Sequence, residues 1–189
     1  MPLPWTFSRL VGARVTLDPL RPTDLEPLFA MQSDPEVCRY LLYEPRTREK
    51  VAEVLARDAD AVRLEKAGDY LQPVIRDEHG AFVGTLYLQL KSVDDRAAEI
   101  GWILLPSAQG HGYAAEAASL LLDFCFDQLD LHRVYAELDP RNTASVSLCG
   151  RLGMRHEGHF VEDMFFKGEW ADTGRYAILA REWTARRGS

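Results

Sequence analysis

Hydrophobic and polar residues alternate along this chain in two ways, and each way predicts a different kind of element. Alternation at every second position is typical of strands, whereas apolar residues three and four positions apart are typical of a helix face. The first pattern predicts strands over 14–20, 70–76, 81–90, 96–104, 133–138, 154–166 and 170–181. The second predicts helices that begin near residue 25 and that cover 47–67, 114–129 and 142–152.

The connections between these segments predict how the strands pair. A turn-forming tetrapeptide that ends at Gly80 predicts one hairpin, and Lys167 with Gly168 predicts a second one near the end of the chain. The order strand, helix, strand over 96–138 predicts a parallel pair joined by a right-handed crossover. We therefore expect an α/β fold in which a mixed, mostly antiparallel sheet of about seven strands is flanked by about four helices.

Length and apolar content favour one domain. The chain has 189 residues, of which 47% are hydrophobic, enough for one sizeable core and short for two. We expect a single domain over 1–189. No apolar run approaches the roughly 18 residues of a membrane span, and the first residues lack a basic segment followed by an apolar one. A cytoplasmic protein without a membrane partner is expected.

Charge and cysteine content limit the classes of ligand and partner that are expected. The net charge of −7 argues against a nucleic-acid partner, because phosphate binding requires a basic surface. An acidic surface favours a cationic substrate, although it also simply keeps a protein in solution. Cys38, Cys125 and Cys149 are unclustered, which argues against a disulfide framework and against a metal site. Each cysteine is expected to be a small buried apolar residue.

The segment 109–114, with the sequence QGHGYA, joins an apolar strand pattern to a helix pattern. The N-terminus of a helix presents free backbone N–H groups and favours anions. Gly110 and Gly112 permit a left-handed backbone and the close approach of a ligand. The segment therefore predicts a pyrophosphate site, and a plain strand-to-helix turn with glycines for packing is the alternative.

Two known nucleotide motifs fit this segment poorly. A P-loop would require Gly-Lys-Ser/Thr at the end of the loop, which is absent, so nucleoside triphosphate binding is excluded. The dinucleotide fingerprint G-x-G-x-x-G would have to accept alanine at position 115. A dinucleotide-dependent dehydrogenase is therefore a weak alternative. It is weakened further because the sequence contains no second mononucleotide-binding unit.

A second motif follows over 142–158, with the sequence NTASVSLCGRLGMRHEG. The two segments together resemble the GCN5-related N-acetyltransferase (GNAT) superfamily, and within it the branch of ribosomal-protein N-terminal acetyltransferases (RimJ/RimL type). The loop that wraps coenzyme A in this family maps onto Gln109, Gly112 and Ala114. The second family pattern maps onto Asn142, Ser145, Leu152, Gly153, Met154, Glu157 and Gly158. Further matches near both ends extend the resemblance over nearly the whole chain.

The resemblance implies the GNAT fold and the transfer of an acetyl group from acetyl-CoA to a primary amine, by direct attack in a ternary complex. The acceptor would be a protein N-terminus or a small molecule, no metal is required, and a homodimer is favoured. A non-catalytic acyl-CoA-binding sensor or scaffold is the alternative function. The residues implied to bind the cofactor are Trp102, Ile103, Leu104, Gln109, Gly110, His111, Gly112, Tyr113, Ala114, Asn142 and Ser145. Of these, His111 is either a phosphate contact or a solvated loop side chain.

The amides of the pantetheine arm are expected to pair with the backbone of 102–104, as if extending the sheet. Such pairing requires an opening between the strands 96–104 and 133–138, and we predict a β-bulge near Gly101 or Trp102 as its cause. The acceptor pocket is expected across the sheet. Its candidate aromatic walls, which core packing explains as well, are Tyr43, Phe165, Trp170 and Tyr176.

Acetyl transfer requires a neutral amine, an acceptor for its proton and a way to release the thiolate. Glu99 is the candidate base, since the family places a carboxylate in this strand; an ion pair with a neighbouring arginine is the alternative. Glu116 is a reserve candidate that helix capping also explains. The tyrosine that protonates the thiolate in many relatives is replaced by Cys149. We therefore expect Ser145 to donate this proton, unless its hydroxyl only caps the helix.

Overall fold

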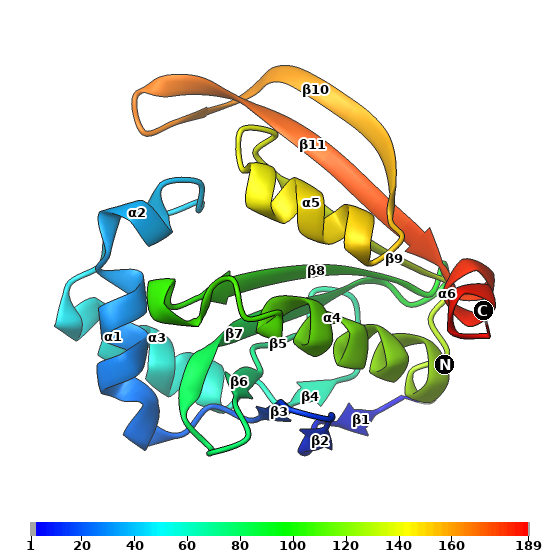
Figure 1. Ribbon diagram of the computed structural model, residues 1–189, viewed down its shortest axis with the longest axis horizontal. Helices are drawn as coiled ribbons and strands as arrows, with labels where there is room; N and C mark the ends of the chain where they lie inside the picture. Colours follow the sequence, from blue (N-terminus) through cyan, green and yellow to red (C-terminus); the bar gives the residue numbers. More distant parts are fainter. Residues whose placement is uncertain (1–2, 189) are drawn as a thin grey trace.

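The computed structural model describes residues 3–188, and Figure 1 shows how its elements are arranged. The strands are β1 (Trp5–Thr6), β2 (Leu10–Val11), β3 (Thr16–Asp18), β4 (Arg63–Leu64), β5 (Tyr70–Leu71), β6 (Val74–Arg76), β7 (Phe82–Ser92), β8 (Ala97–Leu104), β9 (Arg133–Leu138), β10 (Arg155–Phe166) and β11 (Glu169–Leu179). The helices are α1 (Leu25–Gln32), α2 (Pro35–Cys38), α3 (Arg48–Ala59), α4 (Tyr113–Asp123), α5 (Thr143–Arg151) and α6 (Ala180–Arg187). Two 3-10 turns, η1 (Pro22–Asp24) and η2 (Pro106–Ala108), and a π-helical segment, η3 (Phe124–Gln128), complete the described elements.

The main sheet has nine strands in the order β10-β11-β9-β8-β7-β6-β3-β2, with β5 paired to β7 beside this path. Only β8 and β9 are parallel among the described pairs, which confirms the predicted parallel pair and the mostly antiparallel sheet. The sheet exceeds the expected size because the strand expected over 70–76 is divided into β5 and β6, and because β2, which has only two residues, was not expected. Strands this short carry no readable hydrophobic period.

Helices pack on both faces of the sheet, and β8 contributes side chains to both layers. Trp102 and Leu104 belong to the apolar cluster that includes the buried face of α4. Ile103, between them, packs with the cluster of α1 and α3. Because side chains alternate along a strand, Glu99 and Gly101 share the α1–α3 face with Ile103. This alternation determines on which face of the sheet each candidate side chain lies.

Two element boundaries expected from periodicity are wrong. The helix expected over 47–67 ends at Ala59, and β4 follows and pairs with β1. Leu64 is buried in that strand and continues the helix-like spacing of apolar residues, so the periodicity extended the predicted helix too far. The strand expected over 70–76 is divided at Pro73, which lacks the N–H group that a continuous ladder needs.

The first and last expected strands are also shorter than the pattern suggested. Only Thr16–Asp18 of the segment 14–20 forms β3, and the final strand stops at Leu179, where α6 begins. The backbone N–H of Leu179 donates to Glu182 Oε2 over 2.9 Å, which caps α6. Trp183 is buried, and its indole N–H donates to Asp123 Oδ1 over 2.8 Å. The strand ends where this helix can dock onto η3 and α4.

The parallel strands β8 and β9 separate soon after they begin. Their paired residues run only from Ala97 with Arg133 to Glu99 with Tyr135. Beyond that point β8 continues beside β7, whereas β9 continues beside β11 (Figure 1). The predicted opening in the sheet is therefore confirmed.

The predicted cause of this opening is wrong. β8 pairs with β7 in unbroken register from Ala98 to Leu104, and the irregularity in this pair lies between Leu90 and Ser92. A Cβ on Gly101 would make only an ordinary contact, 3.7 Å from Tyr87 Cβ. The opening arises because β9 stays with the β10–β11 hairpin, and not from a bulge in β8.

A buried ion cluster holds β3, η1 and β6 together. The guanidinium of Arg76 donates to Asp18 Oδ2 over 3.1 Å and to Asp24 Oδ1 over 2.9 Å. Burial raises the pKa of Asp18, but the hydrogen bond and charge of Arg9, with further arginines, outweigh it and hold that pKa below its ordinary value. Because the folded pKa is the lower one, this stabilisation is present above about pH 4 and is lost as the pH falls further.

Arg76→Met is expected to lower the free energy of unfolding by about 3–5 kcal/mol, because it leaves the buried Asp24 without its guanidinium partner and removes one of the guanidinium groups that contact Asp18. Urea denaturation at neutral pH measures the loss. Arg48→Met is the matched control, since it breaks only an exposed ion pair with Glu26 and should change stability little. Equal losses in the two variants would contradict a structural role for the buried cluster.

No helix within residues 3–188 is long and apolar enough to cross a membrane. The same residues contain no group of three or more His, Cys, Asp and Glu side chains arranged to hold a metal ion. All three cysteines are free and buried, as expected.

Candidate active site

The segment expected to bind pyrophosphate begins α4 with a left-handed glycine. Gly112 is the N-cap of α4 with a φ of 83°, and Gly110 has a φ of 80°. Gly112 has no side chain with which to cap this helix, and no hydrogen bond from a described side chain takes that place. Its first N–H groups are therefore available to a ligand, in the orientation that favours an anion.

A cleft of about 640 Å³ lies in front of this N-terminus, between α4 and α5. The residues expected to bind the cofactor that line it are Trp102, Ile103, Leu104, Gln109, Gly110, Gly112, Tyr113, Ala114, Asn142 and Ser145. His111 is exposed and is not among the lining residues; its carbonyl accepts a hydrogen bond from Arg14 over 3.2 Å. The structure thus brings together two motifs that lie far apart in the sequence.

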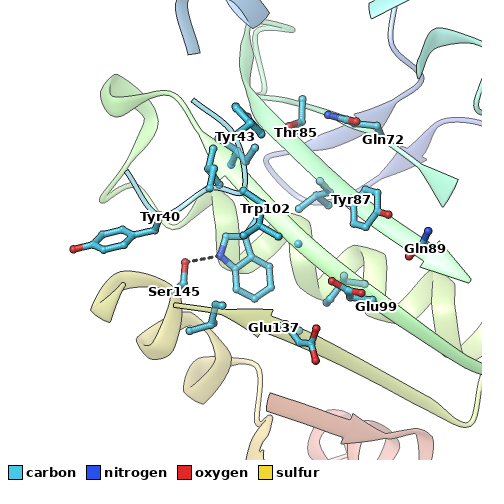
Figure 2. Close-up of a pocket in the computed structure, with 18 of the residues that line it drawn as sticks. Tyr40, Tyr43, Gln72, Thr85, Tyr87, Gln89, Glu99, Trp102, Glu137 and Ser145 are labelled. Atoms are coloured by element: carbon cyan, nitrogen blue, oxygen red, sulfur yellow. Dashed lines mark hydrogen bonds between the residues drawn. The ribbon is translucent and has the colours of Figure 1, made fainter. Parts of the chain in front are cut away.

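Trp102 and Ser145 face each other across the opening in the sheet (Figure 2). The indole N–H of Trp102, on β8, donates to Ser145 Oγ, on α5, over 3.1 Å. Asn142 Oδ1 accepts from the backbone N–H of Ser145 over 3.1 Å, so the amide side chain caps α5 and not the serine hydroxyl. Since the serine oxygen accepts from the indole, its own O–H remains able to donate.

A second cavity, of about 430 Å³, opens on the α1–α3 side of the sheet, across from the first cleft. It is named the acceptor cavity after the acceptor pocket that the sequence predicts there. It shares Trp102 and Ser145 with the first cleft, so the two spaces meet at this pair. Its polar walls include Asp58, Tyr87, Gln89, Glu99 and Glu137. Carboxylates on these walls favour a cationic ligand.

Glu99 lies in the wall of the acceptor cavity with 22% of its side chain exposed. Lys91 Nζ donates to Glu99 Oε2 over 3.1 Å, so the neighbouring cation is a lysine and not the arginine considered from the sequence. Burial and the negative charge of Glu99 together raise the pKa of Tyr87 and of Tyr135 above their ordinary values. The carboxylate therefore lies near two phenols and one ammonium group. Figure 2 shows Glu99 with Tyr87 and Gln89 on the wall of the cavity.

The reserve base and the substituted cysteine lie outside both cavities. Glu116 accepts hydrogen bonds from the backbone N–H of Arg14 and from its guanidinium, which ties the start of β3 to α4. Burial raises the pKa of Glu116, but these bonds outweigh it and the pKa lies below its ordinary value. Cys149 is fully buried, and burial raises the pKa of its thiol to about 12. Structural roles explain both residues.

The expected aromatic walls are correct for Tyr43 and wrong for the hairpin residues. Phe165 and Trp170 are 61% and 57% exposed and pack edge to face near the tip of β10–β11. Tyr176 stacks on His156, with ring centroids 4.9 Å apart. Hydrophobicity alone could not reveal that this hairpin extends past the cavity. The other aromatic residues of the wall are Tyr40, Tyr87 and Trp102.

Some lining residues were missed although the sequence carried a signal for them. In β7 the residues Thr85, Tyr87 and Gln89 are polar or amphipathic at alternate positions, between buried leucines. Such alternation marks a strand face that is not packed against apolar core. Asp58 had no comparable signal, because it lies in a charged stretch of α3.

The cleft at the helix N-terminus and the acid-lined cavity meet where the sheet splits, an arrangement that can hold two ligands side by side. The chain belongs to the GNAT acetyltransferase family: the family model described as an acetyltransferase (GNAT) domain matches residues 14–155. It is an N-acetyltransferase of this family, an enzyme class that moves an acetyl group to an amine.

Similar proteins cover nearly the whole chain. The uncharacterized N-acetyltransferase YnaD of Bacillus subtilis is 33% identical over 162 residues, 85% of this chain and 90% of that protein. The spermidine N(1)-acetyltransferase of Escherichia coli is 26% identical over 171 residues, 90% of this chain and 89% of that protein.

Solved structures of this family confirm the expected GNAT fold. A GNAT-family acetyltransferase from Bacillus anthracis superposes with a TM-score of 0.82 at 27% identity, covering 92% of this chain and 99% of that one. The spermidine N-acetyltransferase of Vibrio cholerae, in complex with CoA and spermine, gives 0.78 at 26% identity, covering 90% and 98%.

Proposed function

We propose that residues 1–189 form a single N-acetyltransferase domain that transfers acetyl from acetyl-CoA directly to a primary amine in a ternary complex. The acceptor is the amine of a small molecule or of a protein N-terminus. The observation that carries this proposal is the junction of two cavities at Trp102 and Ser145. Two ligands that meet at one point react without a covalent enzyme intermediate, because proximity supplies much of the rate.

The cleft fits coenzyme A on the geometry of this chain. The free N–H groups at Gly112 and the following turn of α4 suit a pyrophosphate. The backbone of 102–104, which β9 does not pair, suits the amides of a pantetheine arm. The V. cholerae relative was solved with CoA, which supports acyl-CoA binding in this fold. Bound acetyl-CoA supplies an activated acetyl thioester.

Glu99 is proposed as the base that receives the proton of the acceptor amine. An ammonium group has no lone pair, so its proton must leave before attack. Glu99 lies in the acceptor cavity, and its hydrogen bond with Lys91 orients the carboxylate there. The same strand forms one wall of the cleft, which couples the base to the reacting centre.

Ser145 is proposed to donate a hydrogen bond to the departing thiolate and to stabilise its negative charge. Its hydroxyl lies where the two cavities meet and keeps a free donor. The position seven residues after Asn142 holds the buried Cys149 and not a tyrosine. The resemblance implies that the RimJ/RimL-type branch lacks this tyrosine and carries a serine at the place of Ser145. The combination therefore supports that branch for this chain.

Ser145→Ala is expected to lower kcat about tenfold and to leave the KM for acetyl-CoA nearly unchanged. The lost hydrogen bond forms mainly when charge develops on sulfur, so the chemical step is affected more than binding. Steady-state kinetics with one amine acceptor measures both constants.

Trp102→Phe is the matched control for Ser145→Ala, because it removes the bond to the serine oxygen and keeps the hydroxyl. It should change kcat less than Ser145→Ala does. If the two variants lose kcat equally, the serine serves only to hold the indole, and another group stabilises the thiolate.

The proposed function is tested by thiol release from acetyl-CoA in the presence of short N-terminal peptides, polyamines, amino acids and aminoglycosides. Polyamines belong in the panel because two of the similar proteins are named spermidine acetyltransferases. Release that depends on one class of amine supports the transferase and identifies its acceptor. Saturable acetyl-CoA binding without release for any amine would favour the sensor function instead.

We also propose a cytoplasmic homodimer that requires neither nucleic acid nor membrane. Acetyl-CoA is a cytoplasmic metabolite, and the net charge of −7 disfavours polyanionic partners. Phe160, Val161, Phe165 and Trp170 are exposed on β10–β11, where a second copy would remove them from water. Sedimentation velocity distinguishes monomer from dimer.

A further inference from the structure

Two buried side-chain polar atoms lack a hydrogen-bond partner within residues 3–188, and both belong to walls of the acceptor cavity. They are the hydroxyl of Tyr43 and Oδ2 of Asp58. Native proteins leave few buried polar atoms unpaired, because each such atom costs free energy. Their coincidence in one cavity indicates that the missing partners belong to the ligand.

Asp58 is the stronger of the two indications. It is 3% exposed, and both of its donors, Arg57 Nε at 2.6 Å and the Tyr70 hydroxyl at 2.8 Å, contact Oδ1. Oδ2 is therefore free of protein donors. The charge of Asp58 reaches the neighbouring phenol, because burial and a hydrogen bond to this carboxylate raise the pKa of Tyr70.

The other carboxylates of the cavity are already paired with basic side chains. Glu137 accepts from Arg175, Asp139 from Arg141 and Glu99 from Lys91. Asp58 is paired with Arg57 through one oxygen only, and the Arg57 side chain is largely in solvent. Among the described carboxylates of this cavity, Asp58 is thus the one whose unpaired oxygen is buried.

The hydroxyl of Tyr43 provides a second position at which a ligand can form a hydrogen bond. The guanidinium of Arg46 covers its ring at 3.8 Å, and burial raises the pKa of the hydroxyl well above its ordinary value, so it stays neutral. A neutral hydroxyl both donates and accepts hydrogen bonds. In Figure 2, Tyr43 and Glu137 lie on opposite sides of Trp102.

We propose that the acceptor carries a second ammonium group, which Asp58 Oδ2 binds while the first amine is acetylated. A carboxylate accepts but cannot donate, so its partner must be a donor, and a charged donor binds it most strongly. The Tyr43 hydroxyl contacts the same molecule. The acceptor is accordingly a small linear diamine or polyamine. This inference rests on the proposed function and specifies its substrate class.

The test compares linear diamines with monoamines of the same carbon number, in thiol-release assays on the full chain. A site built around a buried hydrogen bond rejects an analogue that lacks the bonding group, so wild type should prefer the diamine at least about tenfold in kcat/KM. Asp58→Asn should abolish this preference through a higher diamine KM, with kcat and the monoamine constants unchanged. Equal use of both amines by wild type, or equal losses for both in the variant, would overturn the inference.

Tyr43→Phe keeps the test decisive if Asp58→Asn fails to fold. Removal of an unpaired buried hydroxyl should leave the melting temperature unchanged or higher, because no protein partner is lost. The KM for the diamine should nevertheless rise several-fold. A melting temperature that drops together with an unchanged KM would show that the hydroxyl serves the fold and not the ligand.

Direct binding separates failure of this inference from failure of the proposed function. If no amine supports thiol release, the proposed function fails, and calorimetric titration of the CoA-saturated protein with a diamine decides the remaining question. Binding to wild type that Asp58→Asn abolishes would uphold the second ammonium site. Absence of diamine binding would overturn it.

Discussion

Gly112→Val should weaken acetyl-CoA binding about a hundredfold, a free-energy change of about 2.8 kcal/mol, and leave the chain folded. Gly112 has a φ of 83° as the N-cap of α4, a conformation that a β-branched residue strongly disfavours. A Cβ there would also lie 3.3 Å from the guanidinium of Arg14. The backbone must therefore turn away, and the N–H groups of the first turn lose their alignment on the ligand. Calorimetric titration with acetyl-CoA measures the loss.

Gly168→Val is the matched control for Gly112→Val. Gly168 has a φ of 79° in the β10–β11 turn, and nothing lies within 4 Å of a Cβ placed there. The two substitutions thus impose the same backbone strain, one at the cleft and one away from it. Both should lower the melting temperature by similar amounts, and only Gly112→Val should lose affinity. Comparable affinities in the two variants would contradict the assignment of the pyrophosphate site.

Glu99→Gln should lower kcat by about a hundredfold to a thousandfold, within the range of a lost general base, with acetyl-CoA affinity unchanged. Glutamine keeps the shape of the side chain and can still pair with its neighbours, but it cannot receive a proton from the amine. Steady-state kinetics, with the acceptor identified by thiol release, provides the measurement.

Glu137→Gln tests whether any carboxylate in the cavity suffices. Glu137 lines the same cavity as Glu99 and pairs with Arg175 as Glu99 pairs with Lys91. It lies on β9, on the other side of the split. Its replacement should lower kcat only slightly. The reverse result, a large loss for Glu137→Gln and a small one for Glu99→Gln, would transfer the role of base to Glu137.

The cofactor side of the site was predictable because its function depends on local sequence. Glycines at 110 and 112 determine the backbone of the loop, and Asn142 caps the helix that it begins. Such features are encoded within a few neighbouring residues. The opening between β8 and β9 was predicted because a pantetheine arm requires free backbone groups there. The structural cause of the opening was not predicted correctly. Strand divergence depends on which neighbour β9 follows, and no local pattern specifies that.

The acceptor side was harder to predict because its walls come from distant segments. Asp58 on α3, Tyr43 on the connection after α2, and Glu137 on β9 converge only in the folded chain. Phe165 and Trp170 show the opposite error. The sequence predicted that these aromatic side chains line the acceptor pocket, but in the structure they are exposed on the hairpin. Acceptor specificity is therefore a property of tertiary structure in this chain, whereas cofactor binding is a property of its motifs.

In the proposed reaction, acetyl-CoA in the α4–α5 cleft meets an amine in the acceptor cavity. The most direct measurement incubates the purified chain with acetyl-CoA that carries an isotope-labelled acetyl group, together with a linear diamine, and analyses the products by mass spectrometry. Labelled monoacetylated diamine and free coenzyme A are expected in equal amounts, and Glu99→Gln should reduce both. Free coenzyme A without labelled amine, or no product from any amine of the panel, would contradict this reaction.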